Sequence, residues 1–296
     1  MALPDFQLDR RLVRRRAARA AASYTGADFL AREIARRMAE RLDYIRLAPT
    51  RILDLGCGPG ADQPLLRARY PEAAYLGVDF AAAMLRPGRA AGNFLQRLLG
   101  KPQRLAAHSF AADAEALPVA RGSVSLVWSN LMLNWLHDPM PALRECHRVL
   151  EVGGMVMFST LGPDTLKELR AALPASRGER VHRFIDMHDL GDALVQAGFS
   201  DPVMDMEMVT LTYADLDGLL SDLRDCGATN AATGRPRGLA GKAGWMAARA
   251  AYRNLERQGR LPATFEVIQG HAWKMPPKVT EDGRAVVHFE PSRRSV

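Results

Sequence analysis

Three stretches of the sequence combine glycines and carboxylates in a pattern that suits nucleoside binding. An apolar run at residues 51–55 breaks into Gly56-Cys57-Gly58-Pro59-Gly60, where glycines permit positive φ and let a ligand approach bare backbone. Asp79 lies 19 residues beyond Gly60 and ends the next apolar run. A carboxylate at such a strand end can hold a ribose diol through charge-assisted hydrogen bonds. These residues predict a nucleotide-type pocket.

Two further acids indicate which nucleoside this pocket would take. The glycines alone are also consistent with a simple tight turn, and a dinucleotide site would prefer Gly-x-Gly-x-x-Gly with a pyrophosphate at the next helix. Asp54 precedes Gly56 by two residues, where its charge would repel a pyrophosphate but could accept from an ammonium group or order a water. Asp113 follows another expected strand and suits the exocyclic amine of adenine. The acids therefore favour an adenosine that carries a zwitterionic amino acid and no phosphate.

Apolar runs alternate with helical patterns along the chain, which predicts an α/β fold. Five such units before residue 161 indicate a parallel sheet, and two later strands that flank helices indicate an antiparallel pair. Strands are expected at residues 51–55, 75–79, 105–111, 123–128, 155–160, 203–212 and 264–273. Helices are expected within residues 8–48, 80–85, 140–150, 186–197, 214–226 and 241–258, with Asp186 as an N-cap and Gly198 as a stop.

The order of these elements suggests three parts. We expect an N-terminal helical cap at residues 1–48 and a main domain at residues 49–275. The main domain would contain a helical insertion at residues 213–260, and residues 276–296 would form a loosely attached tail.

Charge and composition exclude several classes of protein. The 296 residues carry a formal charge of +7, but residues 1–19 hold six arginines against two aspartates, and Arg293 and Arg294 add to the surplus. The body is nearly neutral, so we expect no nucleic-acid groove. No apolar run approaches about 20 residues and no signal peptide is visible, so we expect a cytoplasmic protein without a membrane span. The three cysteines lack a C-x-x-C spacing, so we expect neither disulfides nor a metal site.

The segment from Asp54 to Gly60, together with Asp79 and Asp113, resembles the class I methyltransferases that use S-adenosylmethionine. That resemblance implies a Rossmann-like, mostly parallel seven-stranded sheet with an antiparallel last hairpin, N-terminal helices and a helical insertion before the last strand. It also implies a set of cofactor-binding residues: Asp54, Gly56, Gly58, Gly60, Asp79, Asp113, Ala114 and Asn130.

A narrower resemblance covers most of residues 18–273. Five segments look like the malonyl-carrier-protein O-methyltransferases of biotin synthesis: residues 20–24, 128–135, 182–184, 227–230 and 262–267. This family methylates the free carboxylate of a malonyl thioester. The resemblance implies an acyl carrier protein as partner, and the arginine-rich N-terminal helix would suit the acidic surface of such a carrier.

Methylation of a carboxylate fits the residues that the chain offers. The substrate carboxylate is already ionised near neutral pH, so it can attack a sulfonium methyl group without a catalytic base. Positioning would then supply most of the rate, with Tyr24, Asn130 and Trp135 as candidates for that role. The substrate charge calls for a cation, for which Arg183 is the first candidate and Arg235 and Arg237 come after it, and each could instead be an ordinary surface arginine.

Two other functions remain compatible with the sequence. Residues 9–11, 162–170 and 285–289 also look like an assembly factor of respiratory complex I from the same superfamily, which hydroxylates an arginine of its partner. A protein that binds the cofactor without turnover is the other alternative, although intact Asp54, Asp79 and Asp113 count against it. The sequence also leaves open whether the thioester is on a carrier protein or on coenzyme A.

Overall fold

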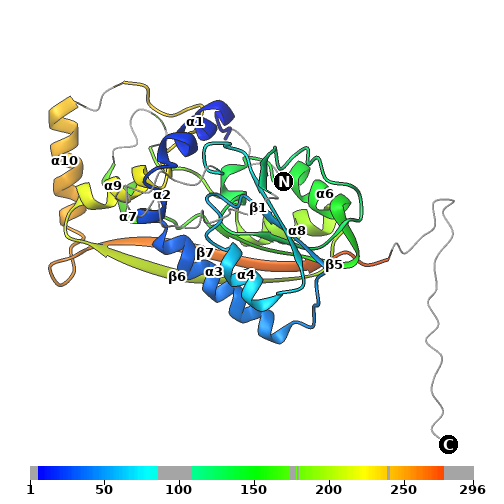
Figure 1. Cartoon of the computed structure of the whole chain (residues 1–296). Helices are drawn as coiled ribbons and strands as arrows, with labels where there is room; N and C mark the ends of the chain where they lie inside the picture. Colours follow the sequence, from blue (N-terminus) through cyan, green and yellow to red (C-terminus); the bar gives the residue numbers. More distant parts are fainter. Residues whose placement is uncertain (1–5, 86–108, 174–177, 179, 239–240, 277–296) are drawn as a thin grey trace, which may run out of the picture.

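A seven-stranded sheet forms the centre of the protein in a computed structural model that describes residues 6–85, 109–173, 178, 180–238 and 241–276. Its strands are β1 (Arg51–Leu55), β2 (Ala74–Asp79), β3 (Ser109–Ala111), β4 (Val124–Ser129), β5 (Leu150–Leu161), β6 (Ser200–Tyr213) and β7 (Leu261–Trp273). They lie in the order β3-β2-β1-β4-β5-β7-β6, and β7 runs antiparallel to both of its neighbours (Figure 1). The fold class expected from the sequence is confirmed.

Helices precede the sheet, cover both of its faces and fill the connection before β7. They are α1 (Arg10–Ala20), α2 (Tyr24–Ala27), α3 (Phe29–Arg41), α4 (Gln63–Arg69), α6 (Met140–Val149), α7 (Lys167–Ala172), α8 (Met187–Gln196), α9 (Leu216–Asp225) and α10 (Gly241–Arg253), with short 3-10 turns η1 (Leu42–Tyr44) and η2 (Leu133–Trp135). Among the helices of the described part, none is long and apolar enough to cross a membrane.

Alternate side chains of the central strands enter two separate cores. Ile52 and Leu126 pack with residues of α3 and α4 on one face, whereas Leu53 and Val127 pack with residues of α6 and α8 on the other. Strands covered on both faces read as continuous apolar runs, which is why β1 and β4 were recognisable. This burial fixes the carboxyl ends of β1, β2 and β4 at one edge of the sheet.

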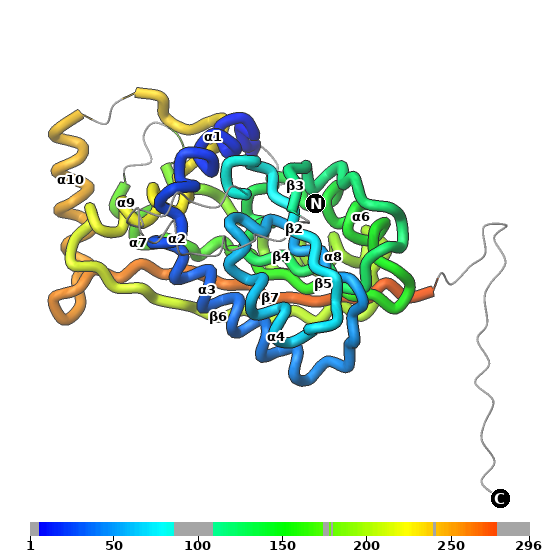
Figure 2. The backbone as a smooth tube through the Cα atoms, in the orientation of Figure 1, coloured from blue at the N-terminus to red at the C-terminus, as the bar shows by residue number. Residues whose placement is uncertain are grey.

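The long strands β6 and β7 extend beyond the rest of the sheet, and α7, α9 and α10 lie over their extension (Figure 1). The backbone trace shows α1 beside the segment that follows α9 (Figure 2). Two backbone hydrogen bonds join them, from the Asp9 amide to the Ala231 carbonyl at 2.9 Å and from the Thr233 amide to the Gln7 carbonyl at 2.8 Å. The N-terminal helix is therefore part of the same unit as the insertion, and a boundary at residue 48 stays a prediction.

Three local expectations need correction or lie outside the described residues. Residues 82–85 form a turn instead of the expected helix, and the stretch 86–108, with most of the expected third strand, lies outside the described residues. The strand expected at 155–160 begins at Leu150, because Leu150 pairs with Val124 before a register shift. The short helix α7 was not expected. Asp186 does cap α8, accepting from the His188 amide at 2.8 Å, and Gly198 ends it with φ of +99°.

Two glycine-to-alanine substitutions should change stability in opposite directions. A Cβ on Gly270 in β7 would lie 2.8 Å from the Phe158 ring, so Gly270→Ala should lower the free energy of unfolding by about 1–3 kcal/mol. Gly191 in α8 has open space, so Gly191→Ala should raise that free energy by roughly 0.5–1 kcal/mol. Urea unfolding measures both. Equal shifts of the same sign would contradict the packing described.

Candidate functional site

The glycine turn after β1 forms the floor of a cavity at the carboxyl edge of the sheet. The φ angles of Gly56, Gly58 and Gly60 are +81°, +52° and +84°, values that residues with a side chain rarely adopt. A Cβ on Gly56 would also lie 2.6 Å from the Met132 side chain. Gly56 and Gly58 line the cavity, whereas Gly60 shapes the turn from outside the lining.

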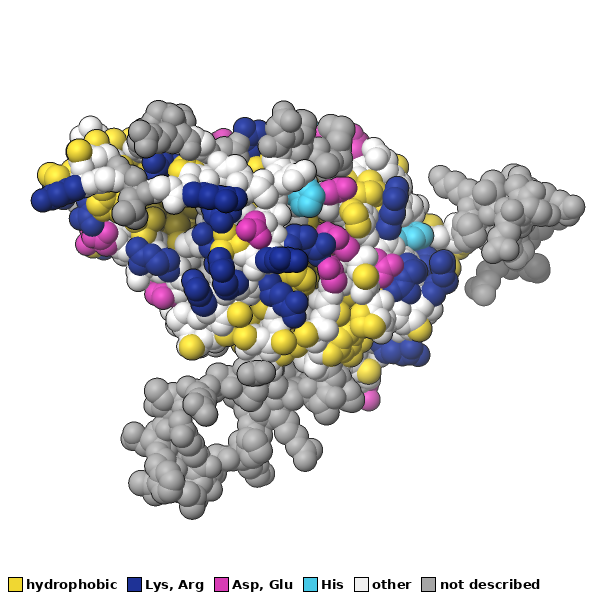
Figure 3. Space-filling model, turned by 90° about the horizontal axis from the view of Figure 1, so that it is seen from above, with side chains coloured by type: hydrophobic (Ala, Val, Ile, Leu, Met, Phe, Trp, Pro, Cys, Tyr) yellow, Lys and Arg dark blue, Asp and Glu magenta, His cyan; other side chains and the backbone are white. Residues whose placement is uncertain are grey.

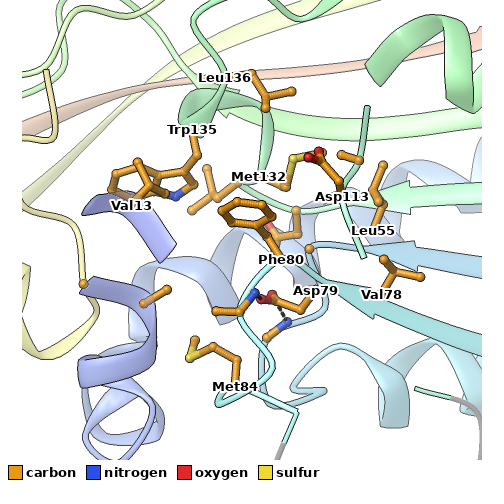
Figure 4. A pocket seen from close by; sticks show the side chains of 18 of the residues that line it. Val13, Leu55, Val78, Asp79, Phe80, Met84, Asp113, Met132, Trp135 and Leu136 are labelled. Atoms are coloured by element: carbon orange, nitrogen blue, oxygen red, sulfur yellow. Dashed lines mark hydrogen bonds between the residues drawn. The ribbon is translucent and has the colours of Figure 1, made fainter. Parts of the chain in front are cut away.

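Asp79 closes the turn from the end of β2. Its carboxylate accepts from the Gly58 amide at 3.0 Å and from the Ala81 amide at 2.7 Å (Figure 4). Burial raises the pKa of Asp79, and the two backbone hydrogen bonds oppose that shift. Each oxygen keeps a further lone pair, so the carboxylate can also accept from a diol in the cavity.

Asp113 lies on the cavity wall after β3, beside Ala114. It forms an ion pair of 2.5 Å with Arg10 of α1, which also reaches Glu115 at 2.8 Å. The other Asp113 oxygen accepts from the Glu115 amide at 3.0 Å. The acid expected to bind an amine thus also anchors the N-terminal helix over the cavity.

Asp54 and Asp62 are buried beneath the cavity, and neither belongs to its lining. Asp54 accepts from the Tyr75 hydroxyl at 2.5 Å, and burial raises its pKa. Asp62, which sequence reasoning missed, accepts from Trp128 Nε1 at 2.9 Å and from Asn130 Nδ2 at 3.1 Å. Burial raises the pKa of Asp62, while these two donors oppose the shift.

Asn130 is part of the cavity wall, and all of its polar atoms have partners. Its amide nitrogen also donates to the Ala31 carbonyl of α3 at 2.9 Å, and its oxygen accepts from the Ser159 hydroxyl at 2.8 Å. Asn130 therefore joins α3 to the ends of β4 and β5.

The first cavity has a volume of about 140 Å³, and its upper wall comes from the N-terminal helices. Val13 and Ala17 of α1 line this space together with Tyr24 and Trp135, and the close-up labels Val13 and Trp135 (Figure 4). Burial, followed by nearby Cys226 and three aspartates, raises the pKa of Tyr24. Its hydroxyl therefore remains a hydrogen-bond donor at neutral pH and does not act as a base.

A second cavity of about 220 Å³ adjoins the first, and Trp135 lines both. Apolar side chains, some of them from α7, α9 and β7, form most of its wall, and Arg180, Arg224 and His182 supply its charged and titratable groups. The chain passes directly from one cavity to the other, since Gly227 lines the first and Ala228 the second.

The three arginines expected to bind substrate lie outside the lining of both cavities. Arg183 and Arg237 are exposed. Arg235 donates to the Ala232 carbonyl at 2.8 Å and lies 3.9 Å from Asp9, so it joins the insertion to the start of α1. The arginines that do line a cavity are Arg10, Arg180 and Arg224, and no spacing pattern in the sequence distinguishes them.

The described residues hold no group of three or more His, Cys, Asp or Glu side chains suited to a metal ion. The cavity nevertheless fits an adenosine with an amino acid. It offers glycine backbone without side chains, an acid at the end of β2 and an apolar wall that includes Leu55, Val78 and Met84.

Comparisons with known proteins agree with this chemistry. A family model described as a methyltransferase domain matches residues 53–158. A solved SAM-dependent methyltransferase from Thermotoga maritima superposes with a TM-score of 0.51 at 14% identity, covering 88% of this chain and 99% of that one. At that identity the likeness shows the fold alone.

Two relatives match almost the whole chain. A malonyl-[acyl-carrier protein] O-methyltransferase of Laribacter hongkongensis is 50% identical over 293 residues, which is 97% of each chain. A protein of the same name from Gallionella capsiferriformans is 48% identical and covers 96% of this chain and 97% of its own. The chain is an S-adenosylmethionine-dependent methyltransferase and belongs to the family of the malonyl-[acyl-carrier protein] O-methyltransferases.

Proposed function

We propose that this protein transfers a methyl group from S-adenosylmethionine to the free carboxylate of a malonyl thioester on an acyl carrier protein. The observation that carries this proposal is the sequence identity of 48–50% to two relatives of that name over nearly the whole chain. The product would be a methyl ester that enters the synthesis of the pimeloyl part of biotin. The three described thiols are free, which suits a reducing compartment such as the cytoplasm.

The cofactor would lie in the first cavity. We assign the binding of the ribose to Asp79, the close approach of the cofactor to bare backbone to Gly56 and Gly58, and the binding of the adenine to Asp113 and Ala114. Gly60, which lies outside the lining, would shape the turn. Asp54 would act from below through Tyr75 or a water, because its own carboxylate is covered. When bound, S-adenosylmethionine supplies an electrophilic sulfonium methyl group.

The chain's own residues would orient the substrate and exclude water. The malonyl carboxylate is ionised at neutral pH, so it would form the bond to the methyl carbon without any residue having to remove a proton, and S-adenosylhomocysteine would leave as the carbon–sulfur bond breaks. Tyr24 can donate to a carboxylate oxygen, since its raised pKa keeps the hydroxyl protonated. Trp135 lies where the two cavities meet, and Asn130 holds the wall in place. Roles of Arg183, Arg235 and Arg237 in binding substrate stay predictions.

The arginine-rich helix α1 is our candidate for docking the acidic carrier protein. Arg11, Arg14, Arg15 and Arg19 are exposed on it. Lys and Arg side chains gather on the face of the molecule seen in Figure 3, which is the side where α1 lies in Figure 1. The same helix lines the first cavity, so a docked carrier would be close to the site.

The complex I alternative gains no support from these relatives. One segment that suggested this alternative, residues 162–170, has a structural role in this chain. The Asp164 amide donates to buried Glu266 at 2.6 Å, and Glu168 accepts from the Thr264 amide at 3.0 Å. Residues 285–289, also quoted for it, lie outside the described residues.

Purified protein incubated with S-adenosylmethionine and malonyl carrier protein should yield the methyl ester, detected as a mass increase of the carrier. Its gene should also rescue a biotin-requiring strain that lacks this methyltransferase. A folded protein that binds the cofactor but gives no ester and no rescue would refute the proposal.

Asp79→Asn should weaken cofactor binding, because the charged acceptor for the ribose diol is lost while most of the turn is retained. We expect the Kd for S-adenosylhomocysteine, measured by calorimetry, to rise about tenfold or more. Asp192→Asn, which removes an exposed carboxylate from α8, is the matched control. Unchanged affinity in Asp79→Asn would show that the diol binds elsewhere.

Charge reversal on α1 tests the carrier surface. The double variant Arg11→Glu and Arg15→Glu should raise KM for malonyl carrier protein roughly tenfold at low salt, with kcat unchanged. Malonyl-N-acetylcysteamine, which has no carrier, should be methylated as before. Arg253→Glu with Arg257→Glu, exposed near the end of α10 and beyond it, should leave both substrates unaffected. An equal loss of kcat/KM on the two substrates would mean that α1 affects the active site itself and not the docking of the carrier.

A further inference from the structure

The second cavity contains two buried polar atoms that lack a hydrogen-bond partner among the described residues. They are Nε of Arg180 and Nε2 of His182. Both residues line the cavity, and the rest of its wall is mostly apolar. A buried donor or acceptor without a partner is costly, so a pair of them around one cavity indicates a ligand that supplies both partners.

The protonation of His182 decides what kind of partner it needs. Burial is the main reason that the pKa of His182 falls to about 4, and the charges of Arg16 and Arg170 lower it further. The ring is therefore neutral at pH 7. A hydrogen bond with the backbone of Asn134 opposes the effect of burial and raises the pKa of His182. A ring N–H that donates to a carbonyl oxygen has this effect, so the ring nitrogen other than Nε2 carries the proton of the neutral ring. The unpaired Nε2 is then an acceptor, and it requires a donor from the ligand.

Three aromatic neighbours hold the His182 ring in this position. The ring stacks on Phe184 with centroids 5.1 Å apart, and it meets Phe6 and Trp135 edge to face at 5.2 and 5.6 Å. Its backbone carbonyl accepts from Arg170 at 3.1 Å. The acceptor is therefore fixed in orientation before any ligand binds.

The two atoms together favour an amide over a carboxylate as the ligand group. A carboxylate would satisfy the Arg180 donor but would present only acceptors to the neutral His182. A secondary amide provides both requirements, since its oxygen accepts and its N–H donates. The apolar walls, which include Leu161, Leu220 and Phe265, suit methylene spacers on either side of such an amide.

We propose that the second cavity receives the amide-bearing arm of the acyl thioester, with Arg180 and His182 binding amide groups of a pantetheine-type chain. This inference rests on the proposed malonyl thioester substrate. The arm would extend through the second cavity, and the malonyl group would pass Trp135 to reach the methyl donor in the first. The substrate carboxylate is then held in the first cavity and not by Arg180.

Substrate truncation tests this assignment. Wild-type enzyme should methylate malonyl-N-acetylcysteamine, which has one amide, with a KM about tenfold lower than that for a malonyl alkyl thioester of equal length without an amide. In His182→Phe and in Arg180→Met the two thioesters should have about equal KM values. The change should come from a higher KM for the amide substrate, with kcat unchanged. Arg253→Met, an exposed change in α10, should retain the full preference.

A binding measurement keeps the test independent of turnover. Pantetheine should bind the wild-type complex with S-adenosylhomocysteine and bind His182→Phe about tenfold more weakly, while both proteins bind S-adenosylhomocysteine equally. An unchanged amide preference in both variants, or no binding of pantetheine to wild type, would overturn the assignment. Failure of the proposed function is a different result, because wild type would then methylate none of the thioesters despite binding cofactor.

Discussion

Asp62 provides the buried polar junction on which the site depends. Its carboxylate accepts from Trp128 at the end of β4 and from Asn130 just beyond it. Asn130 extends these contacts to α3 and to Ser159 of β5. An unpaired charge at this depth would be strongly destabilising. The side chains of Trp128 and Asn130 must therefore stay within hydrogen-bond distance of Asp62. The edge of the sheet, the glycine turn and the N-terminal helices are thereby held in one arrangement.

The N-terminal helix completes the cavity instead of lying beside a finished domain. Gly227 has φ of +75°, and a Cβ there would lie 3.3 Å from Ala20. This close approach lets α1 pack on the insertion while Arg10 reaches Asp113. Residues of α1 and of the insertion thus form one wall of the cavity, although they are more than 200 positions apart in the sequence.

The strands and the acids at their ends were predictable because they depend on local signals. Apolar runs, glycines and strand-end acids lie close together in the sequence, and Asp79 appears where the pattern places it. The arginines that line the cavities were not predictable in the same way. Arg180 lines the second cavity and Arg183 does not, and tertiary packing decides this difference. Asp62 was missed because its partners are 66 and 68 residues away.

Trp135 gives the two cavities a common wall, and this has a thermodynamic consequence. With the cofactor and the acyl chain placed in the two cavities as proposed above, both would contact this indole. Any coupling carried by that contact would be reciprocal, so the cofactor would alter the affinity for the acyl chain by the same factor as the acyl chain alters that for the cofactor. Titrating either ligand in the presence of the other would therefore measure one and the same coupling factor.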